Sequence, residues 1–282
     1  MNYRHDFHAG NFADVVKHAV LARIIVHLGA KPAPFRVIDT HAGAGLYDLT
    51  GPQASQTGEW RDGIARLLTA QVSAEARSLL APYIDAIAAF NSAGSLTVYP
   101  GSPLLVRTWL RPRDRLIACE LEPAAAAALA ENLGSGPRAK ALAIDGWTAL
   151  SAYVPPKERR GLVLVDPPFE APNEFAQLVD AFAQAQRKWT TGIYLLWYPI
   201  KDRSGPDALA KCLKRLGISK ILRAEMAMSK RPDPNKLNGC GLIIVNPPWK
   251  LESELRVLLP ALADCLSQCE GSFRLDWLTD EK

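Results

Sequence analysis

Short aliphatic runs recur along the chain and alternate with longer segments that show helical periodicity. The runs are FRVID (35–39), RLIAC (115–119), KALAI (140–144), GLVLV (161–165), GIYLLW (192–197) and GLIIV (241–245). Continuous apolar runs predict strands that are buried on both faces, and their alternation with helices predicts a parallel sheet covered on both sides. The pattern therefore predicts an α/β fold.

A helix is predicted near the N-terminus, over residues 12–28. Apolar residues recur there at helical spacing, and Asn11 stands at the N-cap position with Asp14 three residues later. Residues 1–10 contain little apolar material, so we expect them to form an extended arm.

One interval between strands is too long for a single crossover. Glu120 lies 81 positions after Asp39, whereas a strand-helix-strand unit needs about 30 residues. Helical patterns fill part of this interval. We therefore expect residues 1–50 to hold the arm, the first helix and the first strand, residues 51–93 to form a small helical insertion, and residues 94–282 to form the remainder of the domain.

Composition and charge narrow the class of protein. Of the 282 residues, 48% are hydrophobic and 22% are charged, which is typical of a folded globular domain. Five cysteines without a CxxC pair indicate reduced thiols, and the sequence suggests neither a signal peptide nor a membrane span. We therefore expect a cytoplasmic protein. The formal net charge of +4 permits an acidic partner such as nucleic acid.

Polar residues follow the ends of four predicted strands. A turn with two glycines, residues 39–45, follows the first strand, and Glu120, Asp145 and Asp166 follow the next three. Ligands of open α/β sheets collect at such carboxyl ends. Glu120 could accept both hydroxyls of a ribose and Asp145 could accept from an adenine amino group, although each acid alone could equally be a helix N-cap. The order is that of class I methyltransferases, which use S-adenosylmethionine.

Two similar tetrapeptides, DPPF (166–169) and NPPW (246–249), each follow an apolar run. DPPF ends the fourth strand of the methyltransferase order, beside the glycine turn, so we predict that it does the chemistry. NPPW follows a later strand, and we predict that Asn246 and Trp249 are structural.

The DPPF motif suits methylation of adenine. The N6 amino group is a poor nucleophile because its lone pair is delocalised into the ring. The Asp166 carboxylate and the Pro167 carbonyl can accept its two hydrogens and direct the lone pair at a methyl group. The prolines stiffen the turn and remove competing N–H donors, while Phe169 offers a face for an extruded base. The alternative is a structural Pro-Pro turn with Phe169 in the core.

Longer motifs resemble one family. They are YRHDFHAGNFADVVKH (3–18), DTHAGAG (39–45), YPGSP (99–103), IDG (144–146), RRGLVLVDPPFE (159–170), GIYLLWYP (192–199) and GLIIVNPPWKLE (241–252). Together they closely resemble the RlmJ-type adenine-N6 methyltransferases of bacterial large-subunit (23S) ribosomal RNA, over nearly the whole chain. The resemblance implies a class I, Rossmann-like methyltransferase fold and N6-methylation of a specific adenine in 23S rRNA by S-adenosylmethionine.

The resemblance also implies roles for individual residues. Asp166 would be catalytic, and the cofactor pocket would be lined by His18, His41, Ser102, Glu120, Asp145, Gly146 and Asp166. The RNA would be faced by Tyr3, Lys17, Pro167 and Phe169. The family has Tyr more often at the position of Phe169, which removes a hydroxyl but retains a stacking face. The substrate would be free or partly assembled large-subunit RNA, and we expect a monomer.

Other functions remain open at this point. A DNA adenine-N6 methyltransferase would use the same DPPF motif, and a catalytically inactive RNA-binding module could retain the fold. Protein-glutamine methyltransferases favour Asn at the first position of the motif, so Asp166 argues against them. All five histidines lie in the first 41 residues, but without a Cys or an acid at ligand spacing they predict no metal site.

Overall fold

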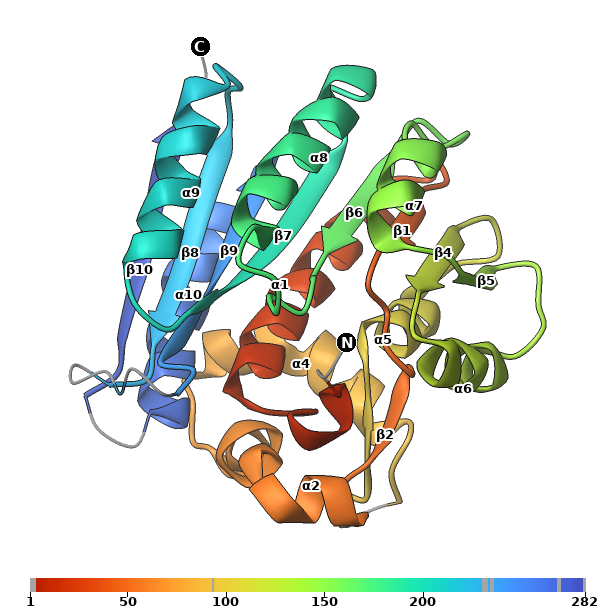
Figure 1. The fold of residues 1–282 in the computed structure, drawn as a ribbon. Helices are drawn as coiled ribbons and strands as arrows, with labels where there is room; N and C mark the ends of the chain where they lie inside the picture. The colour runs from red at the N-terminus through yellow and green to blue at the C-terminus, as the bar shows by residue number, and fades with distance from the viewer. Residues whose placement is uncertain (1–3, 93, 230–232, 234–235, 268–269, 281–282) are drawn as a thin grey trace.

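The computed structural model describes residues 4–92, 94–229, 233, 236–267 and 270–280. An eight-stranded sheet in the order β10-β8-β9-β7-β6-β1-β4-β5 runs through its centre (Figure 1). Its strands in chain order are β1 (Arg36–Asp39), β4 (Arg115–Glu120), β5 (Ala139–Ala143), β6 (Gly161–Val165), β7 (Ile193–Ile200), β8 (Ile221–Ala227), β9 (Gly239–Val245) and β10 (Ser272–Thr279). The α/β class predicted from the sequence is confirmed.

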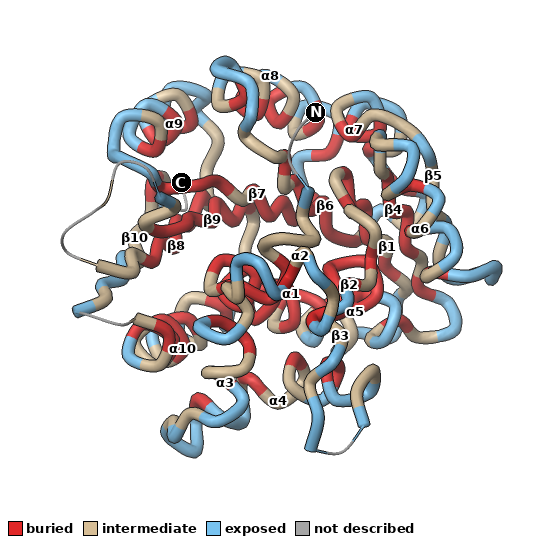
Figure 2. The backbone as a smooth tube through the Cα atoms, turned by 60° about the horizontal axis from the view of Figure 1, so that its bottom comes forward, coloured by how far each residue is buried: buried red, intermediate tan, exposed pale blue. Residues whose placement is uncertain are grey.

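Helices cover both faces of the sheet (Figure 2). One face packs against α7 (Gly146–Tyr153), α8 (Glu174–Lys188) and α9 (Ser204–Arg215), and the other packs against α1 (Phe12–Gly29), α5 (Ser102–Trp109), α6 (Pro123–Leu133) and α10 (Leu251–Leu266). The central strands β6 and β9 are buried along their whole length. This double cover explains why their sequences are continuously apolar.

Strand direction differs from the prediction in one half of the sheet. Strands β5, β4, β1, β6 and β7 run parallel to one another. Strand β9 is antiparallel to both β7 and β8, and β10 is antiparallel to β8. The expectation of a parallel sheet is therefore wrong for β9 and β10. As a result, NPPW lies at the amino ends of the parallel strands, whereas DPPF lies at their carboxyl ends.

Two strands, β8 and β10, were not predicted from the apolar runs, because charged residues interrupt their sequences. Arg223 of β8 is almost fully buried, and its guanidinium donates to both oxygens of Asp276 on β10, at 2.7 and 2.9 Å. Glu225 accepts from the Tyr198 hydroxyl at 2.8 Å and from Arg203. These contacts satisfy charges that would otherwise make burial of the strands costly.

The predicted first helix is confirmed as α1. The Asn11 side chain caps it by accepting from the backbone N–H groups of Ala13 and Asp14 at 2.9 and 3.0 Å. The Asp14 carboxylate accepts from the N–H of Gly10, which precedes the cap. The start of the helix is thus fixed by the side chains of Asn11 and Asp14, which are close in the sequence.

The long interval after β1 contains a ribbon and several helices. Strand β2 (Leu46–Asp48) pairs antiparallel with β3 (Val98–Pro100), and between them lie α2 (Pro52–Thr57), the π-helix η2 (Arg61–Ala65), α3 (Arg66–Thr69) and α4 (Ala74–Ala88). Helix α4 packs against α1 and α10. The division of the chain into three parts remains a prediction. Within the described ranges, no helix is long and apolar enough to cross a bilayer.

Candidate active site

A cavity of about 2120 Å³ opens at the carboxyl ends of the parallel strands. It is bounded by the start of α1, the glycine turn after β1, the DPPF turn and the loop between β8 and β9. The predicted site residues that line it are Lys17, His18, His41, Ser102, Glu120, Asp145, Gly146, Asp166, Pro167 and Phe169. Tyr3 lies outside the described residues. The fold thus gathers every described candidate at one site.

Glu120 connects β4 to the glycine turn. One carboxylate oxygen accepts from Gly43 N at 2.9 Å, and the other accepts from the backbone N–H groups of Leu121 and Glu122, both at 2.8 Å. The N-cap of α6 is Glu122, whose side chain accepts from Ala124 and Ala125. Glu120 is therefore not the cap of the following helix, and the capping alternative is wrong at this position.

Asp145 is the N-cap of α7, because its carboxylate accepts from Thr148 N at 2.8 Å. The same residue also lines the cavity. The next residue, Gly146, permits a very close approach, since a Cβ there would lie 2.3 Å from Thr40 O and 2.7 Å from the His41 ring. A glycine is required at this position for the backbone to pass between the turn and the cavity.

His41 is a neutral acceptor at the wall of the cavity. Burial lowers its pKa to about 4, against the opposing charge of Asp145. Its Nδ1 lies 2.8 Å from Thr40 Oγ1, and that hydroxyl donates to Leu164 O. The hydrogen-bond network therefore assigns the imidazole proton to Nδ1 and leaves Nε2 as an acceptor. Trp147 holds the ring edge-on at 5.1 Å between centroids.

Asp39 is fully buried at the end of β1, beneath Ser102. The Ser102 hydroxyl donates to one oxygen of Asp39 at 2.7 Å, and the other oxygen has no hydrogen-bond partner in the described part of the chain. Burial raises the pKa of Asp39 to about 7, although the Ser102 hydrogen bond acts in the opposite direction. The carboxyl thus titrates near neutral pH behind Ser102, which lines the cavity.

His18 is held by two buried tyrosines. Its Nδ1 lies 2.6 Å from the Tyr99 hydroxyl, which is 2.8 Å from the Tyr83 hydroxyl. Burial is the main reason that the pKa of His18 falls to about 3, and the nearby Lys17 charge lowers it further. Its Nε2 is buried and lacks a hydrogen-bond partner among the described residues. A neutral imidazole with one unsatisfied nitrogen at the cavity wall fits a polar ligand.

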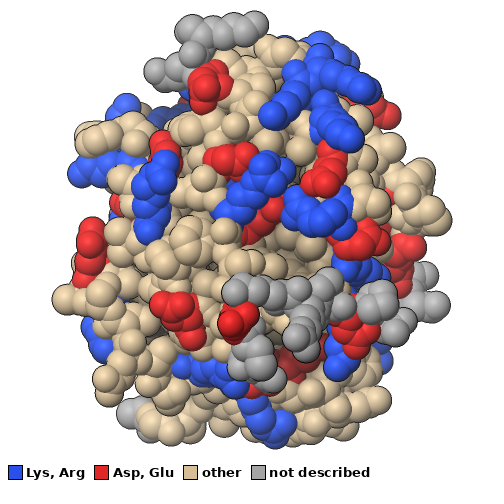
Figure 3. All heavy atoms as spheres, turned by 90° about the vertical axis from the view of Figure 1, so that its left-hand side faces the viewer, with Lys and Arg blue, Asp and Glu red and all other residues tan. Residues whose placement is uncertain are grey.

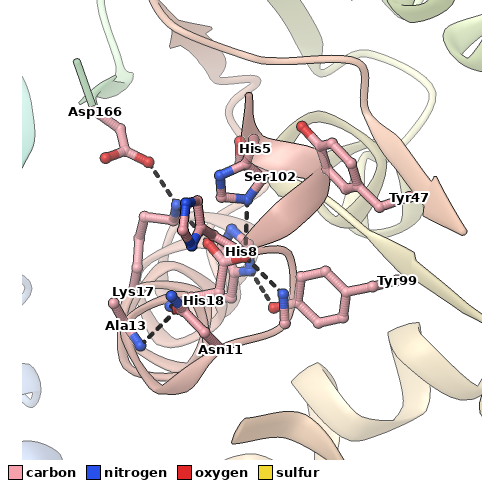
Figure 4. A network of polar contacts seen from close by, with 12 residues as sticks. His5, His8, Asn11, Ala13, Lys17, His18, Tyr47, Tyr99, Ser102 and Asp166 are labelled. Atoms are coloured by element: carbon pink, nitrogen blue, oxygen red, sulfur yellow. Dashed lines mark hydrogen bonds and ion pairs between the residues drawn. The ribbon is translucent and has the colours of Figure 1, made fainter. Parts of the chain in front are cut away.

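Lys17 lies between the carboxylates of Asp14 and Asp166, and Figure 4 shows its contact with Asp166. Its ammonium is 2.8 Å from Asp14 Oδ1 and 2.5 Å from Asp166 Oδ2. Burial acts to lower the pKa of Lys17, but the charges of Asp14 and Asp166 outweigh it and raise the pKa well above its ordinary value. Only 6% of the Lys17 side chain is exposed, so it can reach a nucleotide inside the cavity but not a phosphate on the open surface.

The described part of the predicted arm, residues 4–10, is folded against α1 and is not extended as predicted. Residues His5–Phe7 form a 3-10 turn, η1. His5 Nε2 lies 2.9 Å from Asp14 Oδ2, and His8 Nδ1 lies 3.0 Å from a carboxylate oxygen of Glu59 in the helical interval. Asp14 therefore joins the N-terminal turn to Lys17, and through it to Asp166.

The two tetrapeptide turns have different conformations. In DPPF the left-handed residue is Phe169, with φ of 52°, and its ring packs against Phe175 and Trp197 at 4.8 and 5.8 Å between centroids. In NPPW the left-handed residue is Asn246, whose amide donates to Thr190 O and Gly192 O at 2.8 Å. These bonds explain Asn246 as a structural residue, but the same prediction is wrong for Trp249, which is 80% exposed.

Comparison with known proteins identifies the family of the chain. The family model described as "Ribosomal RNA large subunit methyltransferase D, RlmJ" matches residues 32–279. The chain belongs to the RlmJ family. Two relatives named "Ribosomal RNA large subunit methyltransferase J", from Escherichia coli and Haemophilus influenzae, are 40% and 37% identical and are matched over 100% of both chains. A crystal structure of a Legionella pneumophila protein has a TM-score of 0.86 at 32% identity and covers 96% of this chain and 98% of its own.

Membership of the RlmJ family confirms the resemblance and the class of enzyme predicted from the sequence, a methyltransferase. Several residues of this RlmJ-family site were nevertheless missed. Asp14 was interpreted only as a helix-start signal, although its spacing of three from Lys17 favours a side-chain pair on a helix. The contacts of Tyr99 with His18 and of Trp197 with Phe169 span long stretches of sequence, so no local pattern indicates them.

Proposed function

We propose that the chain transfers a methyl group from S-adenosylmethionine to N6 of one adenine in 23S rRNA. The observation that supports this most directly is Asp166, which lies at the carboxyl end of β6 in the same cavity as Glu120 and Asp145. The relatives' printed names refer to the large ribosomal subunit, and DPPF is the motif that suits an adenine amino group. We further propose that the protein acts as a monomer in the cytoplasm, on free or partly assembled RNA.

The chemistry that we assign to the DPPF turn is orientation of the nucleophile. Asp166 and the carbonyl of Pro167 accept the two N6 hydrogens, which directs the nitrogen lone pair toward the methyl donor. Lys17 holds one oxygen of Asp166 at 2.5 Å and balances its charge, so the other oxygen is available to the base. Phe169, half-buried against Trp197, would form one wall for the extruded adenine. Tyr3 is proposed to contact the RNA from the N-terminus.

The residues of the cavity fit the cofactor. His18 Nε2 is a buried polar atom without a partner among the described residues, and Gly146 leaves room where any side chain would collide with Thr40 and His41. We propose that S-adenosylmethionine is held by His18, His41, Ser102, Glu120, Asp145, Gly146 and Asp166. When bound, it supplies an electrophilic methyl group on a sulfonium. The neutral state of both histidines avoids repulsion of that positive charge.

Replacement of Glu120 is expected to weaken cofactor binding. The amide of the Glu120→Gln variant has one acceptor oxygen where the carboxylate has two. It therefore cannot keep the contacts to the N–H groups of Gly43 and Leu121 and also accept from two ribose hydroxyls. The loss should be about 1–3 kcal/mol in binding free energy, the usual range for a hydrogen bond to a charged group. Calorimetric titration with S-adenosylmethionine measures it, and an unchanged dissociation constant would remove Glu120 from the cofactor site.

Cofactor affinity is also expected to depend on pH through Asp39. Because burial raises the pKa of Asp39 to about 7, the carboxyl is largely neutral below that pH and ionised above it. A positively charged ligand is attracted to the ionised form, so affinity should rise as pH increases through about 7. Titration of the wild type and of Asp39→Asn across this range checks the assignment. A pH dependence that survives in Asp39→Asn would belong to another group, such as His8.

The function itself is tested by transfer of a labelled methyl group to unmodified 23S rRNA, followed by mapping of the product. We expect label at a single adenine, as N6-methyladenosine. Asp166→Ala serves as the inactive control. Label on DNA of matched sequence but not on RNA would show that DNA is the substrate. Binding of RNA without methyl transfer to either nucleic acid would indicate a catalytically inactive RNA-binding module.

A further inference from the structure

The NPPW turn presents a large aromatic side chain to solvent. Trp249 is 80% exposed, so its indole contributes little of the burial that stabilises a fold. The turn itself is firmly held, because Asn246 donates through its amide to Thr190 O and Gly192 O and through its backbone N–H to Lys220 O. A fixed turn with an exposed indole is suited to binding, since little entropy is lost when the ring is contacted.

The surroundings of Trp249 carry positive charge. The Lys250 ammonium lies 4.9 Å from the centroid of the Trp249 ring. At the end of α1, Arg160 donates to Leu28 O at 2.8 Å and to Ala33 O at 2.9 Å, on either side of Lys31 in the sequence. The Arg23–Glu254 pair holds this end of α1 beside the start of α10, where Lys250 lies. In line with this arrangement, burial and then the charges of Arg160, Lys31 and Lys250 lower the pKa of His27. We define the Trp249 surface as Val26, His27, Lys31, Arg160, Trp249 and Lys250.

Nearby acid does not cancel this charge. The charge of Glu254 raises the pKa of His27. The Glu254 carboxylate is already paired, because it accepts from Nε and Nη2 of Arg23 at 2.9 and 2.8 Å. The face over β10 is different, because acidic side chains lie among the basic ones there (Figure 3). Arg203 pairs with Asp207 and Arg223 pairs with Asp276 on that side of the molecule. A basic cluster combined with an exposed aromatic therefore distinguishes the Trp249 surface.

We propose that the Trp249 surface binds the ribosomal RNA substrate outside the catalytic cavity. An unpaired base stacks on Trp249, and Lys31 and Lys250 contact the phosphates that flank it. This inference rests on the proposed function, because the partner is the RNA that is methylated. A second copy of the chain fits less well, since the exposed large apolar side chains of this surface are Val26 and Trp249 alone among the described residues, too few for a stable dimer interface.

The position of the surface defines the kind of RNA that can use it. Because β9 is antiparallel to β7, the NPPW turn and the DPPF turn lie at opposite edges of the sheet, separated by roughly 20–25 Å at the rise of a strand. An RNA that occupies both must extend well beyond the target adenine. The surface therefore selects for a large folded RNA over an isolated adenine-containing strand.

The test is methyl transfer to full-length unmodified 23S rRNA by Trp249→Ala. The KM for RNA should rise about tenfold, as for loss of one stacked base, while kcat and S-adenosylmethionine affinity stay at wild-type values. Trp249→Phe should recover most of the loss because it retains an aromatic face. Phe273→Ala, a change at an aromatic residue that is 46% exposed on β10, is the matched control and should leave KM unchanged.

A second measurement follows the charges. Lys31→Ala and Lys250→Ala should each reduce the slope of log Kd against log salt for rRNA by about 0.7–0.9, the share of one phosphate contact. If the wild type methylates rRNA but Trp249→Ala has the wild-type KM and the lysine variants have the wild-type slope, the surface does not bind RNA. A change of sedimentation in Trp249→Ala would instead assign the surface to self-association. If the wild type itself fails to methylate rRNA, the proposed function fails first.

Discussion

Asp166→Ala is expected to reduce methyl transfer strongly while the protein remains folded and still binds RNA. The side chain is 17% exposed, and Lys17 contacts it at 2.5 Å, so its removal leaves the N6 amino group without its charged acceptor. Loss of one preorganised polar group at a reaction centre lowers turnover by about 10²–10³-fold. Single-turnover transfer to unmodified 23S rRNA measures the effect, and filter binding of the same RNA should show little change.

The matched control for this experiment is Asn246→Ala in the second tetrapeptide. Asn246 has φ of 52° and donates to Thr190 O and Gly192 O, so the variant should lose about 1–3 kcal/mol of stability from unsatisfied carbonyls and strain. Its turnover per folded molecule should equal that of the wild type. If Asn246→Ala stays folded and loses transfer while Asp166→Ala retains it, NPPW is the catalytic copy.

Asp14→Asn is expected to lower both stability and the alkaline limit of activity. Asp14 and Lys17 are both buried and lie 2.8 Å apart, and removal of one charge of a buried pair costs about 3–5 kcal/mol. The activity effect follows from Lys17, whose raised pKa depends on Asp14 and Asp166 together. With one carboxylate gone and burial unchanged, the pKa of Lys17 should fall, and transfer should decline at a lower pH than in the wild type.

The two members of this pair make stability depend on pH in opposite directions. The folded-state pKa of Lys17 is raised, so its contribution is complete below its ordinary pKa of 10.5 and is lost as pH rises above it. The charges of His5 and Lys17 outweigh burial and lower the pKa of Asp14 well below 3.8, so its contribution is present above that pH and is lost in acid. Asp264→Asn, the same change at an exposed position of α10, should alter neither the stability nor the pH profile. If Asp14→Asn lowers methyl transfer equally at every pH and leaves the alkaline limit unchanged, Asp14 has a structural role only.

Much of the fold and of the candidate site could be predicted because the relevant signals are local. Continuous apolar runs identified six strands of the sheet, since a strand buried on both faces needs no polar positions. The N-cap Asn11 and the start of α1 depend on neighbouring residues alone. The positions of Glu120, Asp145 and Asp166 followed from the rule that ligands collect at the carboxyl ends of parallel strands.

Tertiary structure decided what depends on partners distant in sequence. Strands β8 and β10 form because Arg223 and Asp276 neutralise each other across the sheet, and no apolar pattern records this. The direction of β9 is set by its pairing with β7 and β8, and that direction alone separates NPPW from DPPF. Asp14, Lys17 and Asp166 meet although Lys17 and Asp166 are 149 residues apart. The sequence pattern by itself determines which segments are buried, because burial is a property of each segment, whereas strand direction and ion pairing are free energies of contacts that exist only after the chain has folded.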